Sequence, residues 1–267
     1  MDGTGFMQGT LGSFTGAGGL WVQSAGNYRN VNLWLSLADS DADGWADFGS
    51  SGPDEINEIV RDTGSSVNYP VGEEIDVRLS WNQWSSPQTD LDLYLYYYDP
   101  NEAKWVKVAE SVDAQNGQGS QSPYESISFT TEKAGRYGMA VWRSGGPANV
   151  QMHIWLGAVY SNYWLEYRTP SMSLGYPADD ANAFSVAAVH SAPSYALESY
   201  SSAGPTAGPG GAIGGGRRKP DISGYANVAT SSYGTTNPFN GTSAAAPHVT
   251  GAALLVRSVN PGWSPSQ

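Results

Sequence analysis

A serine at the start of a predicted helix is the residue whose surroundings most favour chemistry. Ser243 follows Gly241, which permits a tight turn, and it precedes a run rich in Ala, Leu and Val that ends at Asn260. This pattern predicts a helix from Ser243 to about Val259, with the serine hydroxyl at the positive end of the helix, where developing negative charge is stabilised. A serine that only caps a helix would fit the same local pattern.

The residues around Ser243 belong to a longer motif. Residues 241–251 read Gly-Thr-Ser-Ala-Ala-Ala-Pro-His-Val-Thr-Gly, and they resemble at every fixed position the signature around the nucleophile of subtilisin-like serine peptidases, the subtilases. The segments Ser-Ser-Ala-Gly at 201–204 and Lys-Pro-Asp-Ile at 219–222 are similar to two further family segments, and Tyr176-Pro177 to one that carries a cis proline in some members. The resemblance implies that Ser243 is a nucleophile acting on polypeptide substrates.

A second catalytic residue is predicted far upstream of Ser243. Acyl transfer needs hydrogen-bond donors aimed at the oxygen that becomes negative. In subtilases these donors are the N–H of the nucleophile and an Asn side chain that follows a buried strand, and Gly-Leu-Trp-Val-Gln-Ser-Ala-Gly-Asn at 19–27 matches that context. The resemblance therefore implies Asn27 as the oxyanion residue and Ser24, Ala25 and Gly26 as substrate-pocket residues. Taken alone, an Asn after Gly is typical of a turn.

The base and acid that would activate Ser243 are not found. A serine hydroxyl needs a base within hydrogen-bond reach and a third group that orients the base. Subtilases place both before the oxyanion Asn, but no His precedes Asn27. Asp62-Thr63-Gly64 copies the acid motif at the wrong place and is interpreted as a turn, and His153, His190 and His248 are interpreted as packing residues. We therefore expect the Asp and His in a missing N-terminal part of the same catalytic domain, and this chain alone to be inactive.

Two kinds of strand pattern divide the chain. A loop of small residues precedes Gly19, and the apolar run Ala183–Val189 is typical of a parallel strand buried on both faces. Alternating segments punctuated by turn residues predict a β-sandwich, with strands near 76–81, 90–96, 124–129, 135–142 and 149–156. The predicted fold is α/β, a partial subtilisin-like parallel-sheet core interrupted by an antiparallel β-sandwich insertion. We assign residues 1–63 and 169–267 to the core and 64–168 to the sandwich.

The predicted sandwich carries a second resemblance. Asp-Leu-Asp-Leu at 90–93 and Ala-Gly-Arg-Tyr at 134–137 look like features of bacterial pre-peptidase C-terminal domains. Trp81, Trp84 and Trp105 are candidates for binding a substrate or a surface, and aromatic filling of a sandwich core is the alternative.

An acidic segment suggests a cation site. Asp39, Asp41, Asp43 and Asp47, with Gly44 for the turn, resemble the start of a Ca²⁺ loop, because hard cations need several closely spaced oxygens. The twelfth position of an EF-hand loop would be Ser50, where Glu is required, so a structural Ca²⁺ site of another kind is expected. A solvated acidic turn is the alternative. The family resemblance implies no cofactor for the chemistry itself.

Composition and charge limit the classes of partner that the chain is expected to bind. The formal net charge of −12 argues against nucleic-acid binding, and the absence of Cys excludes thiol catalysis and disulfides. No apolar run reaches membrane-spanning length, so no membrane partner is expected. The family resemblance implies an extracellular, secreted peptidase. The alternative function is a non-catalytic secreted binding protein, or a pseudopeptidase, that binds through its sandwich.

Overall fold

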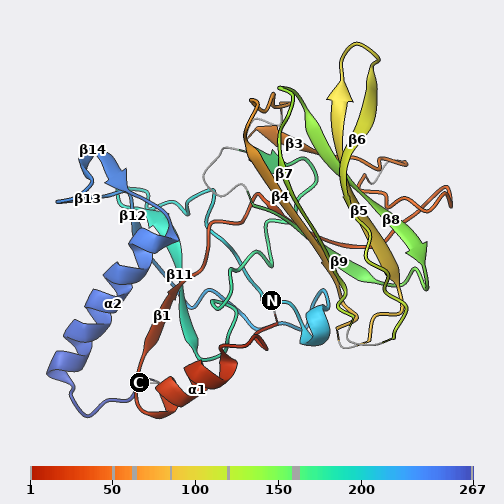
Figure 1. Cartoon of the computed structure of the whole chain (residues 1–267). Coiled ribbons are helices and arrows are strands. Elements are labelled where there is room, and N and C mark those ends of the chain that lie inside the picture. The colour runs from red at the N-terminus through yellow and green to blue at the C-terminus, as the bar shows by residue number, and fades with distance from the viewer. Residues whose placement is uncertain are drawn as a thin grey trace. The chain divides into compact units, whose positions relative to one another are not determined.

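The computed structural model describes residues 2–49, 52–61, 65–84, 86–118, 121–157, 163–265 and 267. The chain forms two compact units (Figure 1). The first unit comprises Met1–Arg29, Pro170–Pro209 and Gly214–Gln267, and the second comprises Asn30–Thr169 and Gly210–Ile213. A 3₁₀ turn, η1 (Pro209–Gly211), spans the boundary between Pro209 and Gly210.

The first unit is built on a parallel sheet of order β1-β11-β12. Trp21 of β1 is level with Ala183 of β11, and Val186 of β11 is level with Ile222 of β12. An antiparallel hairpin, β13-β14, follows this sheet. The elements are α1 (Gln8–Gly16), β1 (Trp21–Ser24), β11 (Ala183–His190), β12 (Ile222–Ala226), β13 (Val228–Thr230), β14 (Gly234–Phe239) and α2 (Thr242–Val259).

Helix α2 packs closely on this sheet (Figure 1). Small and branched side chains make the contact, and the buried core consists of Val186, Ala188, Ala226, Ala245 and Val249. The approach is so close that a Cβ added to Gly224 would lie 2.5 Å from the carbonyl oxygen of Ala245. The α/β class predicted for this part is confirmed, since the strand expected at 183–189 and the helix expected to end near Val259 are both present.

The segment before Gly19 was expected to be a loop, and that expectation was wrong. Residues Gln8–Gly16 form helix α1, in which Leu11 is the only buried residue. A helix with one buried position has no apolar residues repeating at helical spacing, so its sequence does not indicate a helix. Among the described residues, no helix combines the length and apolar character needed to span a membrane.

The second unit holds two antiparallel sheets, of order β10-β3-β8-β5-β6 and β2-β9-β4-β7 (Figure 1). Side chains alternate between core and solvent along their strands, and Leu91, Leu93 and Leu95 of β5 are completely buried. The insertion is therefore antiparallel β structure, as predicted. Its strands are β2 (Asn32–Ser36), β3 (Asn57–Arg61), β4 (Glu74–Trp81), β5 (Asp90–Asp99), β6 (Lys104–Ser111), β7 (Tyr124–Thr130), β8 (Tyr137–Gly145), β9 (Gln151–Leu156) and β10 (Tyr163–Leu165).

The structure places the first boundary earlier than the sequence-based division at residue 63. Strand β2 pairs with β9, and β3 pairs with β8 and β10, so residues 30–61 belong to the second unit. The backbone N–H and C=O groups of these two strands find their partners in the sandwich sheets. The acidic segment that begins at Asp39 is consequently part of the second unit.

The three tryptophans considered for binding have different environments. Trp81 is 2% exposed and belongs to the core, so its proposed role in surface binding is wrong. Its position in β4 has the same parity as the buried positions Ile75, Val77 and Leu79. Trp84 is half exposed, and Trp105 packs edge-on against Tyr98.

Candidate active site

Ser243 is the second residue of α2, and its side chain is exposed. Gly241 precedes the helix with a φ of +87°, a conformation that favours glycine. Neither the hydroxyl nor the N–H of Ser243 makes a hydrogen bond within the described part of the chain. The first N–H groups of a helix have no intrahelical acceptor, so this N–H is available to a ligand.

Asn27, which follows β1, lies against the start of the same helix. Its Oδ1 accepts hydrogen bonds from the N–H of Thr242 at 3.1 Å and from the Thr242 hydroxyl at 3.0 Å. Because a backbone N–H can only donate, the amide atom bonded to Thr242 must be the oxygen. Nδ2 has no acceptor among the described residues, and it lies 3.0 Å from where a Cβ on Gly241 would stand. The structure thus brings Asn27 to the turn that carries Ser243.

Three residues that the sequence analysis did not single out hold this turn. The Thr242 hydroxyl accepts a hydrogen bond from the N–H of Gly26, which links the α2 turn to the segment after β1. The Tyr200 hydroxyl donates to Oδ1 of Asn240, and it accepts a hydrogen bond from the N–H of Gly241 at 3.1 Å. Burial raises the pKa of Tyr200 to about 12, so its hydroxyl keeps the proton that it donates. All three lie in or beside a segment that resembles the family, Thr242 and Asn240 at the nucleophile motif and Tyr200 directly before residues 201–204.

The three predicted pocket residues directly precede Asn27, and backbone hydrogen bonds hold Ala25 and Gly26 in place. Ala25 is completely buried, its N–H donates to the Val186 carbonyl at 2.9 Å, and its carbonyl accepts from Gly175. Gly26 has a φ of +105° and accepts a hydrogen bond from the N–H of Ser202. Ser24 ends β1 and is partly buried. Their contact with a substrate side chain stays a prediction.

Two histidines of the first unit are exposed, which differs from the packing expected for them. The ring of His248 donates from Nδ1 to the carbonyl of Ala244 at 2.8 Å, and Nδ1 of His190 accepts from the N–H of Ala192 at 3.0 Å. Among the described residues, neither ring is hydrogen-bonded to Ser243. The Asp62–Gly64 segment, interpreted as a turn, lies outside the described residues.

His153 in the second unit is buried, as expected. Its Nε2 donates to Oδ1 of Asn32 at 2.6 Å, and its ring stacks on Trp34 with centroids 4.3 Å apart. Burial lowers the pKa of His153 to about 3, which keeps the ring neutral. It is a structural residue of the sandwich.

The Lys-Pro-Asp segment joins strands. Oδ2 of Asp221 accepts from Lys219 Nζ at 2.6 Å and from the Ser185 N–H at 2.7 Å, so it ties the start of β12 to β11. The Lys219 ammonium also donates to the carbonyl of Ala183. The cis proline expected at Tyr176-Pro177 is present. These segments position the sheet, and among the described residues they make no hydrogen bond to Ser243 or Asn27.

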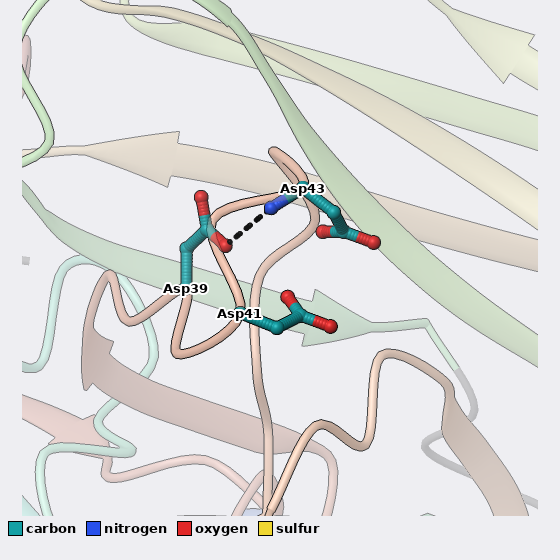
Figure 2. A group of neighbouring side chains, drawn as sticks. All are labelled: Asp39, Asp41 and Asp43. Carbon is teal, nitrogen blue, oxygen red and sulfur yellow. Dashed lines mark hydrogen bonds between the residues drawn. The ribbon is translucent and has the colours of Figure 1, made fainter.

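The acidic residues lie on one loop of the second unit. One carboxylate oxygen from each of Asp39, Asp41 and Asp43 lies within 4.8 Å of the others (Figure 2). Asp47, which is close to these residues in the sequence, is buried, with 6% of its surface exposed. The structure therefore brings three of the four predicted ligands together at one point, and the fourth is considered below.

A parallel sheet that carries an asparagine after one strand, beside a serine at the start of the packed helix, is the arrangement of an α/β serine peptidase core. The profile of the subtilase family matches residues 78–267. The chain belongs to the subtilase family. It has no significant match among curated proteins.

The solved structures that match the chain include two bacterial proteins. The CspB protease of Clostridium perfringens has 17% sequence identity and a TM-score of 0.59, over 96% of this chain and 52% of that one. The chain thus spans about half the length of that protease, and the likeness is one of fold. The pre-peptidase C-terminal domain of collagenase from Bacillus anthracis has 12% identity and a TM-score of 0.28, over 48% of this chain and 88% of that domain. At that score the resemblance of the second unit to such domains stays a prediction.

Proposed function

We propose that the intact protein is a serine endopeptidase that cleaves peptide bonds through an acyl-enzyme on Ser243. The observation that carries this proposal is the turn before α2, where the Ser243 N–H and Asn27 Nδ2 are both without acceptors beside an exposed serine hydroxyl. Two donors of this kind stabilise the oxygen that becomes negative when a carbonyl carbon is attacked. The positive end of α2 favours the same charge.

The proposed reaction follows from these groups. Ser243 Oγ attacks the carbonyl carbon, and its proton passes to a histidine base. The C–N bond then breaks as the base returns the proton to the leaving amine, and water releases the acyl group by the same steps in reverse. Asn27 and the Ser243 N–H hold the oxyanion in both halves.

We propose that the histidine and its aspartate come from a part of the catalytic domain outside these 267 residues. Two observations support this. The described residues contain no histidine hydrogen-bonded to Ser243. The chain also spans only about half of the CspB protease of Clostridium perfringens. The missing part of the domain is then a partner that the active site requires.

The lack of a base also favours a second candidate, a pseudopeptidase or binding protein that acts through its sandwich. A fluorophosphonate probe separates the two, because it labels only an activated serine. Labelling of the full-length product, lost in Ser243→Ala, supports the peptidase. An intact, folded full-length product that takes no label would refute it. The 267-residue chain by itself should take none.

A single substitution tests the role of Asn27. Asn27→Asp keeps an oxygen for the Thr242 N–H and removes the Nδ2 donor. Turnover of the full-length product should fall by roughly 10²–10³, the loss known for this donor in subtilisin. An unchanged turnover, with the melting temperature retained, would contradict the oxyanion role.

We also propose that the protein acts outside the cell on polypeptides. The family resemblance supports this location, and the net charge of −12 makes nucleic acid an unfavourable partner. Detection of the full-length product only inside the cells that make it would contradict the location.

A further inference from the structure

The acidic loop of the second unit has the spacing of a cation site. One oxygen each from Asp39, Asp41 and Asp43 falls within 4.8 Å of the other two (Figure 2). Two oxygens that share a Ca²⁺ at 2.3–2.6 Å lie at most about 5 Å apart. The three carboxylates can therefore bind one ion without a large movement of the loop.

A fourth carboxylate supplies an independent sign of a ligand. Asp47 is 6% exposed, and its Oδ2 accepts a hydrogen bond at 2.7 Å from the N–H of Ser40, the residue between Asp39 and Asp41. This bond joins the Asp47 carboxylate to the backbone of the loop. Its other oxygen, Oδ1, is buried and has no hydrogen-bond partner among the described residues. A buried carboxylate oxygen without a partner is costly, and a bound cation would remove that cost.

The four carboxylates of the loop have little positive charge beside them. Among the described residues, the only ion pair to this group is Arg143 with Asp39, at 3.6 Å. The negative charge of the loop is therefore largely uncompensated by the protein.

The loop is held in shape without an ion. Asp39 accepts hydrogen bonds from the N–H groups of Asp43 at 3.1 Å and Gly44 at 3.2 Å, and Gly44 has a φ of +99°. The next residue, Trp45, forms a bridge with Trp142 of β8, and their ring centroids are 5.0 Å apart. A site anchored to a sheet in this way loses little conformational freedom when it binds.

We propose that Asp39, Asp41, Asp43 and Asp47 bind one Ca²⁺. All of these ligands are oxygens, which hard cations prefer. Ca²⁺ accepts six to eight oxygens in irregular geometry, whereas Mg²⁺ requires a near-ideal octahedron, so a loop with carboxylates on several sides suits Ca²⁺. The ion would stabilise the second unit and take no part in the proposed peptide hydrolysis.

The test compares two double variants of the chain. Asp41→Asn with Asp43→Asn removes two exposed ligands, and Glu73→Gln with Glu132→Gln removes the same charge from exposed positions outside the loop. Binding of Ca²⁺ is measured by calorimetry, and melting temperature is measured in chelator and in Ca²⁺. Terbium luminescence excited through Trp45 provides a local readout.

The wild type and the Glu73/Glu132 control should bind Ca²⁺ with a Kd below about 1 mM. Their melting temperature should rise by about 5–10 °C at a Ca²⁺ concentration a hundredfold above Kd. The Asp41/Asp43 variant should lose at least about tenfold in affinity, as well as the terbium signal. In chelator it should be no less stable than wild type, because repulsion in the loop is relieved.

Two results would overturn the site. One is a wild-type melting temperature that is the same in chelator and in Ca²⁺, with no heat of binding, which is the behaviour of a solvated acidic turn. The other is equal loss of Ca²⁺ affinity in the two double variants, which would show attraction to net charge and no specific site.

Discussion

Protonation of His153 should govern how the stability of the second unit responds to mild acid. The ring is buried between β-strand neighbours, stacks on Trp34 and donates one hydrogen bond to Asn32. Burial holds the pKa of this ring at about 3, against 6.5 for an ordinary histidine. Between these two values the unfolded chain binds a proton that the folded protein does not.

The sign and size of the effect follow from this difference. Stability rises with pH wherever the unfolded state binds more protons, so this histidine has no effect above pH 6.5 and lowers stability as the pH falls below it. Each pKa unit corresponds to about 1.4 kcal/mol. At pH 4.5 the free energy of unfolding should therefore be lower by about 2.7 kcal/mol, and the loss levels off near pH 3 at about 5 kcal/mol.

The assay is urea denaturation of the whole chain, followed by Trp fluorescence, at several values between pH 7 and pH 4.5. His153→Gln is the matched variant, because its amide can still donate to Asn32 and cannot be charged. Carboxylates titrate over part of this range in both proteins, so only the difference between wild type and variant is read. The variant should be less stable at pH 7, where the stacking on Trp34 is lost, and it should lose less stability on acidification. Parallel pH profiles for the two proteins would refute the reasoning.

Two further pairs of substitutions test the packing, one pair in each unit. Gly241→Ala should lower the free energy of unfolding by at least about 1 kcal/mol, since φ is +87° there. Gly251 lies in α2 with open space around it, so Gly251→Ala should raise the free energy of unfolding by about 0.5–1 kcal/mol. Equal melting temperatures for these variants would contradict the strain at the turn. Arg136→Ala should lower the free energy of unfolding by about 2 kcal/mol, because it leaves the carboxylate of Glu58 buried and unpaired. Lys104→Ala removes one partner of an exposed ion pair, and its free energy of unfolding by chemical denaturation should stay within about 0.5 kcal/mol of wild type. A loss at Arg136 no larger than at Lys104 would show that its pair with Glu58 is not a stabilising contact.

The elements whose signals are local could be predicted from the sequence. The helix that begins at Thr242 follows a glycine and continues as an apolar run, and strand β5 alternates at every second residue. Such patterns depend on neighbours within a few positions, so they can be recognised before the chain is folded. The nucleophile motif is of the same kind, being one unbroken string around Ser243.

The contacts that make up the sites depended on segments far apart in the chain. Asn27 and Thr242 are 215 residues apart, and only the pairing of β1 with β11 under α2 brings the amide to the helix. The assignment of residues 30–61 to the sandwich likewise follows from strand pairing between distant segments, such as β2 with β9. Composition and periodicity do not indicate which distant backbone groups will pair. These groups become buried and hydrogen-bonded only when the whole unit packs. The sequence therefore determined the family motif and the local elements, and the tertiary structure decided which residues stand beside Ser243 and which carboxylates face one another.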